Sequence, residues 1–314
     1  MSNKKKILTA LAVVGASALT MAGCSTTTEV ESGPAGDYIG IIEIHGDIGP
    51  SESGGSLLST TSVGYDHDAT MAFVDEMMDD DNNKAILLSL DTPGGTVYES
   101  DEMYLKLMEY KEETGRPIYA YMHSVAASGG YYIAAAADEI YANRNTTTGS
   151  IGVIMSGYDM SELFEKVGLK EIAITSGPNK AMGSAGTPMT EEQIAIYQSH
   201  VDEAYDTFVE IIALGRGMDE AKVREIADGR IYTAKQALEL DLIDGIDVFE
   251  KYKEKVLDGF EGEVEFYLPE EPVEDFMSML LGRIQTMLPK SDVQVMQEFC
   301  EANSKMVPMY YYGG

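Results

Sequence analysis

The sequence predicts an α/β fold, in which a parallel β-sheet carries helices on its faces. Short β-branched or aromatic runs alternate along the chain with longer amphipathic stretches. This alternation is typical of strands joined by helical crossovers. The chain has 314 residues, of which 44% are hydrophobic, so it can bury a large core. We therefore expect an ordered protein of one or two domains and exclude a disordered chain.

The expected elements follow one another as strands and helices in turn. Strands are predicted at Tyr38–Ile44, Ala85–Leu90, Pro117–Met122, Glu139–Ala142 and Lys170–Thr175, where short apolar runs end in turn residues. Helices are predicted at Ala69–Asp80, Val97–Glu113, Gly129–Ala137, Met160–Val167, Thr190–Leu214, Glu220–Ala227 and Thr233–Leu240, where apolar residues recur three or four positions apart. Thr190 is the expected N-cap of the longest helix. The tail Met306–Gly314 has no periodicity, so packed, partner-bound and loose states stay open for it.

The N-terminal residues have the pattern of an export signal. Lys4–Lys6 precede the uncharged apolar run Ile7–Gly23. The sequence Met21-Ala22-Gly23-Cys24 resembles a bacterial lipobox, in which a peptidase cuts before a cysteine that carries lipid. We expect residues 1–23 to be a lipoprotein signal peptide, Cys24 to be lipidated, and the remainder to lie on the extracytoplasmic side of the cell membrane. An uncleaved anchor helix is the alternative.

Charge and composition exclude several classes of function. The chain has 22 basic and 53 acidic residues, a net charge of −31, which disfavours nucleic acids and anionic lipid headgroups as partners. Two cysteines exclude a disulfide scaffold, and the four histidines lack the spacing of metal ligands. The acidic run Asp79–Asn83 lacks the glycine and glutamate of a calcium loop, and no phosphate-loop motif occurs. We therefore expect no nucleic acid, metal or cofactor.

Ser128 is the candidate nucleophile. The predicted strand Pro117–Met122 leads through a short turn into the apolar helix that begins at Gly129, so Ser128 lies where a strand becomes a helix. Free backbone N–H groups and the helix dipole favour an oxyanion at such a turn. The match to the G-x-S-x-G elbow is partial, because Ala126 replaces the first glycine. A helix cap is the alternative role for Ser128.

A second glycine turn is expected beside Ser128. Asp91–Gly95 follows the predicted strand Ala85–Leu90, and the carboxyl ends of parallel strands meet at one edge of a sheet. The Gly95 N–H could approach a substrate carbonyl without obstruction by a side chain. Gly95 and Gly129 are therefore candidates for an oxyanion hole. The alternative is a pair of turns that only reverse the chain.

The general base is expected to be a histidine or a lysine. His123 precedes Ser128 by five residues and His200 falls within a long helix, but neither has an orienting acid at a familiar spacing. A lysine acts as a base only when its amine is neutral, which burial or a lack of nearby carboxylates favours. Lys180 is the only charged residue in the stretch 172–190. An exposed loop lysine would show the same pattern.

Four ordered motifs resemble those of the signal peptide peptidase A family. They are Asp91-Thr92-Pro93-Gly94-Gly95, Ala127-Ser128-Gly129-Gly130-Tyr131-Tyr132, Thr148-Gly149-Ser150-Ile151-Gly152-Val153 and Ser176-Gly177-Pro178-Asn179-Lys180, with further signatures at 227–232 and 237–244. The likeness covers roughly Tyr38 to Phe249. It implies a Clp/crotonase-like fold and a membrane-associated serine endopeptidase with a Ser/Lys dyad. Its expected substrates are apolar peptides, such as signal peptides that remain after secretion.

The resemblance also implies a role for each candidate residue. By position, Ser128 is the nucleophile, Lys180 is the general base and Ser150 orients the lysine amine, while Gly95 and Gly129 form the oxyanion hole. It implies a ring of identical protomers, in which neighbouring subunits share each site. Two departures stand out: many relatives have an acidic residue where this chain has Ala181, and many keep an uncleaved anchor helix. A loop contact that helps to orient the lysine is therefore in question.

These inferences divide the chain into four parts. Residues 1–23 are the signal peptide, 24–37 a flexible tether, 38–250 the serine peptidase domain of Clp/crotonase type, and 251–314 a C-terminal extension that can pack on the oligomer. Three alternatives remain: an acyl-CoA enzyme, a Clp-type Ser-His-Asp peptidase and an inactive lipoprotein scaffold. Export to a compartment without CoA disfavours the first, and the mid-helix position of His200 disfavours the second.

Overall fold

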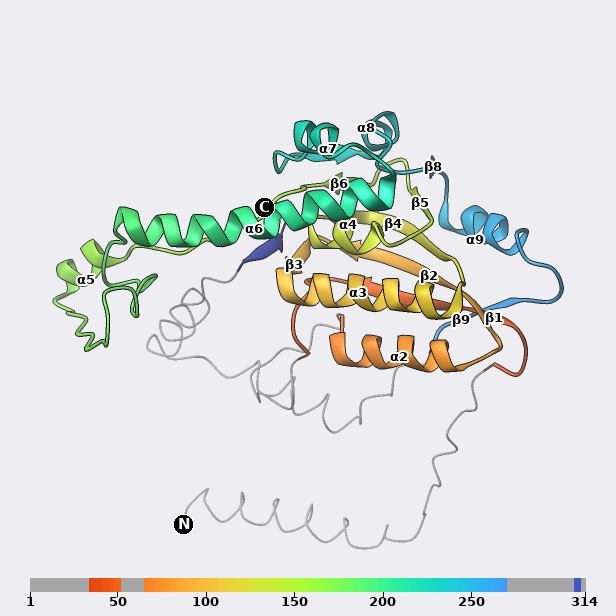
Figure 1. Ribbon diagram of the computed structural model, residues 1–314, viewed down its shortest axis with the longest axis horizontal. Helices are drawn as coiled ribbons and strands as arrows, with labels where there is room; N and C mark the ends of the chain where they lie inside the picture. The colour runs from red at the N-terminus through yellow and green to blue at the C-terminus, as the bar shows by residue number, and fades with distance from the viewer. Residues whose placement is uncertain (1–33, 52–64, 270–307, 312–314) are drawn as a thin grey trace, which may run out of the picture. The chain divides into compact units, whose positions relative to one another are not determined.

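A mostly parallel β-sheet forms the centre of the fold (Figure 1). The computed structural model describes residues 34–51, 65–269 and 308–311. Within these ranges the strand order is β7-β6-β4-β2-β1-β9, with β5 beside β4 and β8 beside β5. The strands are β1 (Tyr38–His45), β2 (Asn83–Thr92), β4 (Ile118–Ala127), β5 (Glu139–Ala142), β6 (Thr147–Gly149), β7 (Ile231–Thr233), β8 (Gly245–Ile246) and β9 (Glu265–Tyr267). Each pair in this sheet is parallel except β6 with β7. The predicted α/β class is confirmed.

Helices cover both faces of this sheet. Among the helices that contribute to the larger core are α2 (His67–Asp79), α3 (Val97–Thr114) and α4 (Gly129–Ala134), and α9 (Phe249–Leu257) packs on the opposite face. In β2, Ile86 and Leu88 join the larger hydrophobic core, whereas Ala85 and Leu87 pack with Tyr252 of α9 in the smaller one. Successive side chains of a strand point to opposite faces, so β2 is buried on both sides. This burial explains its almost unbroken apolar sequence.

The longest helix, α6 (Glu191–Arg216), is buried only in its C-terminal half. Phe208 and Ile212 lie in the larger core. Thr190 and Gln193 form a capping box at its start, which confirms the predicted N-cap. We call residues 156–203 the arm; they comprise α5 (Ser161–Val167), the following loop and the first half of α6, and none of them is buried. The short helices α7 (Glu220–Ile226) and α8 (Ala234–Glu239) follow α6.

The predicted strand Lys170–Thr175 is wrong. This segment of the arm is irregular, and the side chains of Ile172 and Ile174 are 78% and 98% exposed. Alternating apolar residues predict a strand with one face on a core. Here no described strand pairs with the segment, and its apolar side chains face solvent. The pattern therefore reflects an uncovered apolar surface.

A second, two-stranded sheet joins distant parts of the chain. It pairs β3 (Gly94–Thr96) with β10 (Met309–Tyr311) in an antiparallel ladder. The described part of the tail is therefore packed, because Met309–Tyr311 pair with β3. Packing is one of the three states that the sequence left open. Among the described helices none is both long and apolar enough to cross a bilayer. The predicted signal segment and Cys24 lie outside the described residues.

Candidate active site

Ser128 occupies a strained turn between β4 and α4. Its backbone angles, φ 53° and ψ −117°, are costly for a residue other than glycine. The side chain is 1% exposed, and its Oγ atom has no hydrogen-bond partner among the described residues. The Ser128 side chain makes no capping hydrogen bond to α4. The alternative role of Ser128 as a side-chain helix cap is therefore wrong. A buried hydroxyl without a partner costs stability, which points to a functional role.

The two glycine turns meet beside Ser128. A Cβ atom placed on Gly129 would lie 3.2 Å from Gly95 N and 3.3 Å from Gly94 Cα, so the two turns almost touch. Gly94 has a φ of 106°, which only glycine adopts readily. The Gly129 N–H lies in the first turn of α4, where it has no acceptor within the helix. The structure thus brings Ser128, Gly129 and Gly95 together at one sheet edge.

Ser150 lies next to the same turn. β6 runs parallel to β4 and places Gly149 opposite Ala127, and the Ser128 N–H donates to Gly149 O at 2.8 Å. Ser150 follows with a φ of 51° and a side chain that is mostly buried. Its own N–H donates to Arg230 O at 2.8 Å. Ser128 and Ser150 therefore lie near each other within one chain.

Lys180 is not part of this cluster within one chain. It is exposed in the arm, and Figure 1 shows this part of the arm at the end of α6 that lies away from α4 and β4. Hydrogen bonds tie its loop to α6: Gln193 Nε2 donates to Pro178 O at 3.1 Å, and Asn179 Nδ2 donates to Glu192 Oε1 at 3.4 Å. The described residues of one copy therefore do not supply the burial expected around a neutral lysine.

Neither candidate histidine contacts Ser128. The His123 ring packs against Tyr121 and Phe249, and its Nε2 lies 2.9 Å from Ser89 Oγ. Burial lowers the pKa of His123, although the nearby Asp91 carboxylate opposes this shift. His200 is exposed on α6. The nucleophile therefore has no base among the described residues around it.

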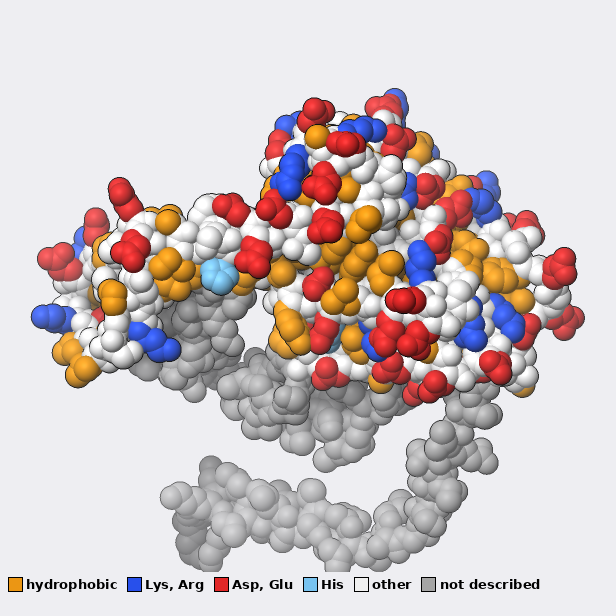
Figure 2. Space-filling model, viewed as in Figure 1, with side chains coloured by type: hydrophobic (Ala, Val, Ile, Leu, Met, Phe, Trp, Pro, Cys, Tyr) orange, Lys and Arg blue, Asp and Glu red, His pale blue; other side chains and the backbone are white. Residues whose placement is uncertain are grey.

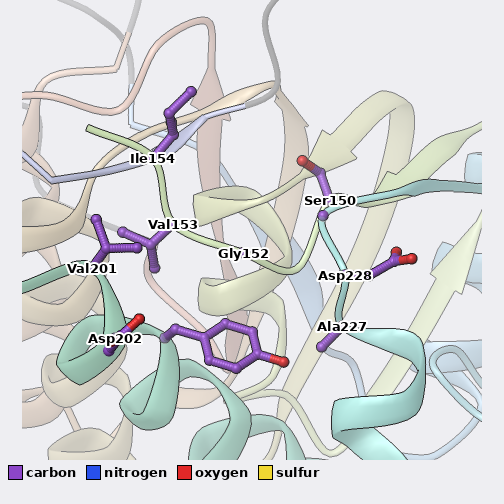
Figure 3. A pocket seen from close by; sticks show the side chains of 10 residues that line it. Ser150, Gly152, Val153, Ile154, Val201, Asp202, Ala227 and Asp228 are labelled. Carbon is purple, nitrogen blue, oxygen red and sulfur yellow. The ribbon is translucent and has the colours of Figure 1, made fainter. Parts of the chain in front are cut away.

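A pocket of about 410 Å³ opens beside Ser150. In Figure 3, Val201 and Asp202 of α6 lie across the pocket from Ala227 and Asp228, and Ser150 lies at its rim. The pocket leaves the Ser150 side of the cluster accessible to a group from outside the chain.

Comparison with known proteins identifies the family. A model of peptidase family S49 matches residues 110–259. A putative signal peptide peptidase SppA from Enterococcus faecium is 34% identical over 302 residues, which are 92% of this chain and 85% of the relative. The chain belongs to peptidase family S49.

Other relatives align with a smaller part of this S49 chain. A putative protease of Synechocystis sp. is 44% identical over 51% of this chain and 57% of its own length. The chloroplastic serine protease SPPA of Arabidopsis thaliana is 33% identical over 67% of this chain but only 30% of its own length. These likenesses make the chain a serine peptidase of family S49.

Family S49 membership and the site geometry bear on the same residues. The matched range includes Ser128, Ser150 and Lys180, whereas Gly95 lies before it. The sequence reasoning missed Gly94 as a close neighbour of the nucleophile, although the Gly94-Gly95 pair was a signal for it. It also missed Tyr310, which β10 places opposite Gly95. No local pattern in the tail indicates that this residue lies beside the candidate site.

Proposed function

We propose that this S49 peptidase is a Ser/Lys endopeptidase, whose complete site combines Ser128 of one copy with Lys180 of another. One observation carries the proposal: the buried Ser128 Oγ has no partner and lies beside two glycine turns. A nucleophile in this position requires a base, and the described part of its own chain does not provide one. Lys180 lies on an exposed arm that is free to reach a second copy.

The reaction follows from these positions. The neutral amine of Lys180 accepts the Ser128 proton while Oγ attacks the carbonyl carbon of a peptide bond. The N–H groups of Gly95 and Gly129 donate to the oxyanion that develops. The ammonium of Lys180 then protonates the leaving amine, and water hydrolyses the acyl ester. Ser150, which adjoins the Ser128 turn, receives the incoming lysine amine by a hydrogen bond and orients it.

The exposed apolar residues of the arm support a homo-oligomer with shared sites. Five of them lie close together in sequence and range from 45% to 98% in exposure: Leu163, Val167, Leu169, Ile172 and Ile174. An apolar group of this size is unusual on the surface of a monomer and fits an interface with another protein chain. A second copy that covers the arm brings Lys180 to a neighbouring Ser128, as in a ring of protomers.

The proposed substrates are extended apolar peptides, including signal peptides left after secretion. The relative named as a signal peptide peptidase supports this substrate class. The proposed location is the extracytoplasmic face of the cell membrane, with attachment through lipid on Cys24. The strong negative charge supports attachment by lipid, because it disfavours binding to anionic headgroups.

The test compares wild type with Ser128→Ala, Lys180→Ala and Lys170→Ala in hydrolysis of an apolar fluorogenic peptide. We expect Ser128→Ala and Lys180→Ala to lose about 10⁴-fold or more in kcat/KM while keeping their oligomer mass. Lys170→Ala is the matched control, since it removes another exposed lysine of the arm. Mixing the two inactive variants should restore part of the activity, because mixed oligomers contain sites with both residues.

Other outcomes of this test would contradict the proposed base, the activity or the shared site. Loss of activity in Ser128→Ala alone would return the role of base to a histidine. Equal hydrolysis by the wild type and both variants, or none by an assembled wild type, would favour the inactive scaffold. Full activity of a monomeric wild type would contradict the shared site.

A further inference from the structure

Thr92 lies between the two glycine turns of the candidate site. It is the last residue of β2, is fully buried, and pairs with Ala126 of β4, two residues before Ser128. The Ser/Lys mechanism described above does not use it. Its side chain carries a hydroxyl on one branch and a methyl group on the other, and the two branches contact different turns. Thr92 therefore links the two turns.

The hydroxyl branch holds the turn at Gly94. The Gly94 N–H donates to Thr92 Oγ1 at 3.1 Å, across the rigid ring of Pro93. Thr92 Oγ1 also lies 3.5 Å from Gly94 O, and the Ile48 N–H donates to that carbonyl at 2.9 Å. Gly94 has a φ of 106°, and a glycine adopts negative φ values as readily as positive ones. These hydrogen bonds therefore select one conformation of Gly94.

The conformation of Gly94 decides where the Gly95 N–H points. The Gly94 C=O and the Gly95 N–H belong to one trans peptide group, so they point in opposite directions. Because Ile48 holds the carbonyl on its own side of β3, the Gly95 N–H points to the other side. The Gly95 N atom also lies close to Gly129, since a Cβ atom on Gly129 would be 3.2 Å from it. Rotation of this one peptide group would remove a donor from the proposed oxyanion hole.

The methyl branch of Thr92 contacts the second turn. A Cβ atom on Gly130 would lie 2.6 Å from Thr92 Cγ2, so the methyl group has room only because this residue has no side chain. Gly130 follows Gly129, the second proposed donor, in the first turn of α4. One side chain thus touches both parts of the proposed oxyanion hole. Serine would keep only the hydroxyl of this side chain, and valine would keep its shape without the hydroxyl.

We propose that Thr92 is a positioning residue for the oxyanion hole. The inference rests on the proposed function, in which the N–H groups of Gly95 and Gly129 donate to the developing oxyanion. The Thr92 hydroxyl holds the Gly94–Gly95 peptide group in the orientation that presents the Gly95 N–H before a substrate binds. A donor that is already oriented gains strength as negative charge develops, so it lowers the barrier more than it improves binding of the peptide. Loss of this hydroxyl should therefore lower kcat and leave KM nearly unchanged.

The test compares Thr92→Val and Thr92→Ser with wild type in hydrolysis of an apolar fluorogenic peptide. In Thr92→Val, which lacks the hydroxyl, we expect kcat to fall about 10-fold or more and KM to change by less than about 2-fold. Thr92→Ser keeps the hydroxyl, so its kcat should stay within about 3-fold of wild type. Thr146→Val is the matched control, because it removes another buried hydroxyl, one that donates to Met122 O of β4. Its kcat should equal that of wild type.

Inhibition by a peptide aldehyde gives a readout that a change in stability alone would not move. Ser128 Oγ bonds to the aldehyde carbon, the C=O double bond becomes single, and the Ser128 proton passes through the base to the former carbonyl oxygen. That oxygen occupies the proposed oxyanion hole, as in the transition state. Thr92→Val should therefore weaken inhibition by about the factor that it removes from kcat. Urea denaturation and oligomer mass check that each variant is folded and assembled.

The failures of this inference and of the proposed function can be told apart. Full kcat in an assembled Thr92→Val would overturn the role of Thr92 and leave the peptidase activity standing. Equal losses in Thr92→Val and Thr92→Ser would overturn it as well, since the hydroxyl would not be the cause, and so would a rise in KM alone. If Thr92→Val does not assemble, Thr92→Cys, whose thiol is a weak acceptor, takes its place beside Thr92→Ser. If wild type hydrolyses no peptide, the proposed function itself fails.

Discussion

Gly95 has no room for a side chain, so we expect Gly95→Ala to disturb the candidate site strongly. A Cβ atom there would lie 1.8 Å from Ile48 O, a backbone atom that cannot rotate away. Ile48 also holds β3 by accepting from Thr96 N–H and donating to Gly94 O, both at 2.9 Å. We expect Gly95→Ala to lower the free energy of unfolding by about 3 kcal/mol and kcat/KM by about 100-fold or more.

Urea denaturation and peptide hydrolysis measure these two effects. Gly49→Ala is the matched control, because a Cβ atom there has no neighbour within 4 Å. Unchanged activity and stability in Gly95→Ala would contradict this prediction, because the added methyl group would then fit without displacing β3 or the Gly95 N–H.

At this scale the sequence predicted the half of the site that lies at one sheet edge. Ser128, Gly129 and Gly95 lie at the carboxyl ends of strands of one parallel sheet. Because these ends meet at one edge of the sheet, the sequence predicts that the three residues lie close together. The position of Lys180 did not follow from such a rule. Its loop depends on a long helix that leaves the core, and no local pattern of residues determines how far that helix extends.

At the scale of the elements, an ion pair between Arg216 and Asp244 holds the C-terminal end of α6 near the sheet. Arg216 Nη1 and Nη2 donate to the two carboxylate oxygens of Asp244 at 3.0 and 2.7 Å, and Ile140 N of β5 donates to the same carboxylate at 2.7 Å. Partial burial alone would raise the pKa of Asp244, but the hydrogen bonds from Arg216 and Ile140 outweigh it and lower the pKa.

Asp244→Asn should therefore destabilise the protein in a pH-dependent way. We expect a loss of about 2 kcal/mol at pH 7, reduced from the value for fully buried pairs because the carboxylate is partly exposed. A lowered pKa in the fold gives stability that is complete above about pH 4, the ordinary value for Asp, and is lost as the pH falls through the folded-state value.

Urea denaturation of wild type and variant between pH 7 and pH 3 checks this. Asp228→Asn, which breaks the exposed pair with Arg230, is the control and should change stability little. A difference between wild type and Asp244→Asn that stays constant down to pH 3 would contradict the assigned role of the charge.

The sequence predicted the long elements better than the short ones. α3 and α6 begin or end within a few residues of their predicted bounds, because many apolar positions define each helical face. β8 and β10 have two and three residues, too few for a period to appear. Their pairing comes from partners far away in the chain, which sequence periodicity does not contain.

For the whole molecule, the proposed shared site depends on the arm. Ile172→Glu combined with Ile174→Glu places charges on its most exposed apolar surface. We expect this variant to be monomeric and at least about 100-fold less active, because Lys180 then no longer reaches a second copy. Sedimentation velocity and peptide hydrolysis at equal concentrations measure both effects. Leu214→Glu, at a 70% exposed leucine outside the arm, should leave assembly unchanged. An active monomeric double variant would place the base within one chain.

The contrast between the acid-free stretch 172–190 of the arm and the rest of the surface has a consequence for the conditions under which copies meet. Acidic side chains are scattered over the face shown in Figure 2, whereas the stretch 172–190 contains no acid. Two such molecules repel each other over distances that shrink to about 10 Å at an ionic strength of 0.1 M. We therefore expect added salt to favour the proposed contact between the arm of one copy and a second copy. If the site is shared as proposed, ionic strength therefore sets how many copies of Ser128 lie beside a Lys180 of another copy.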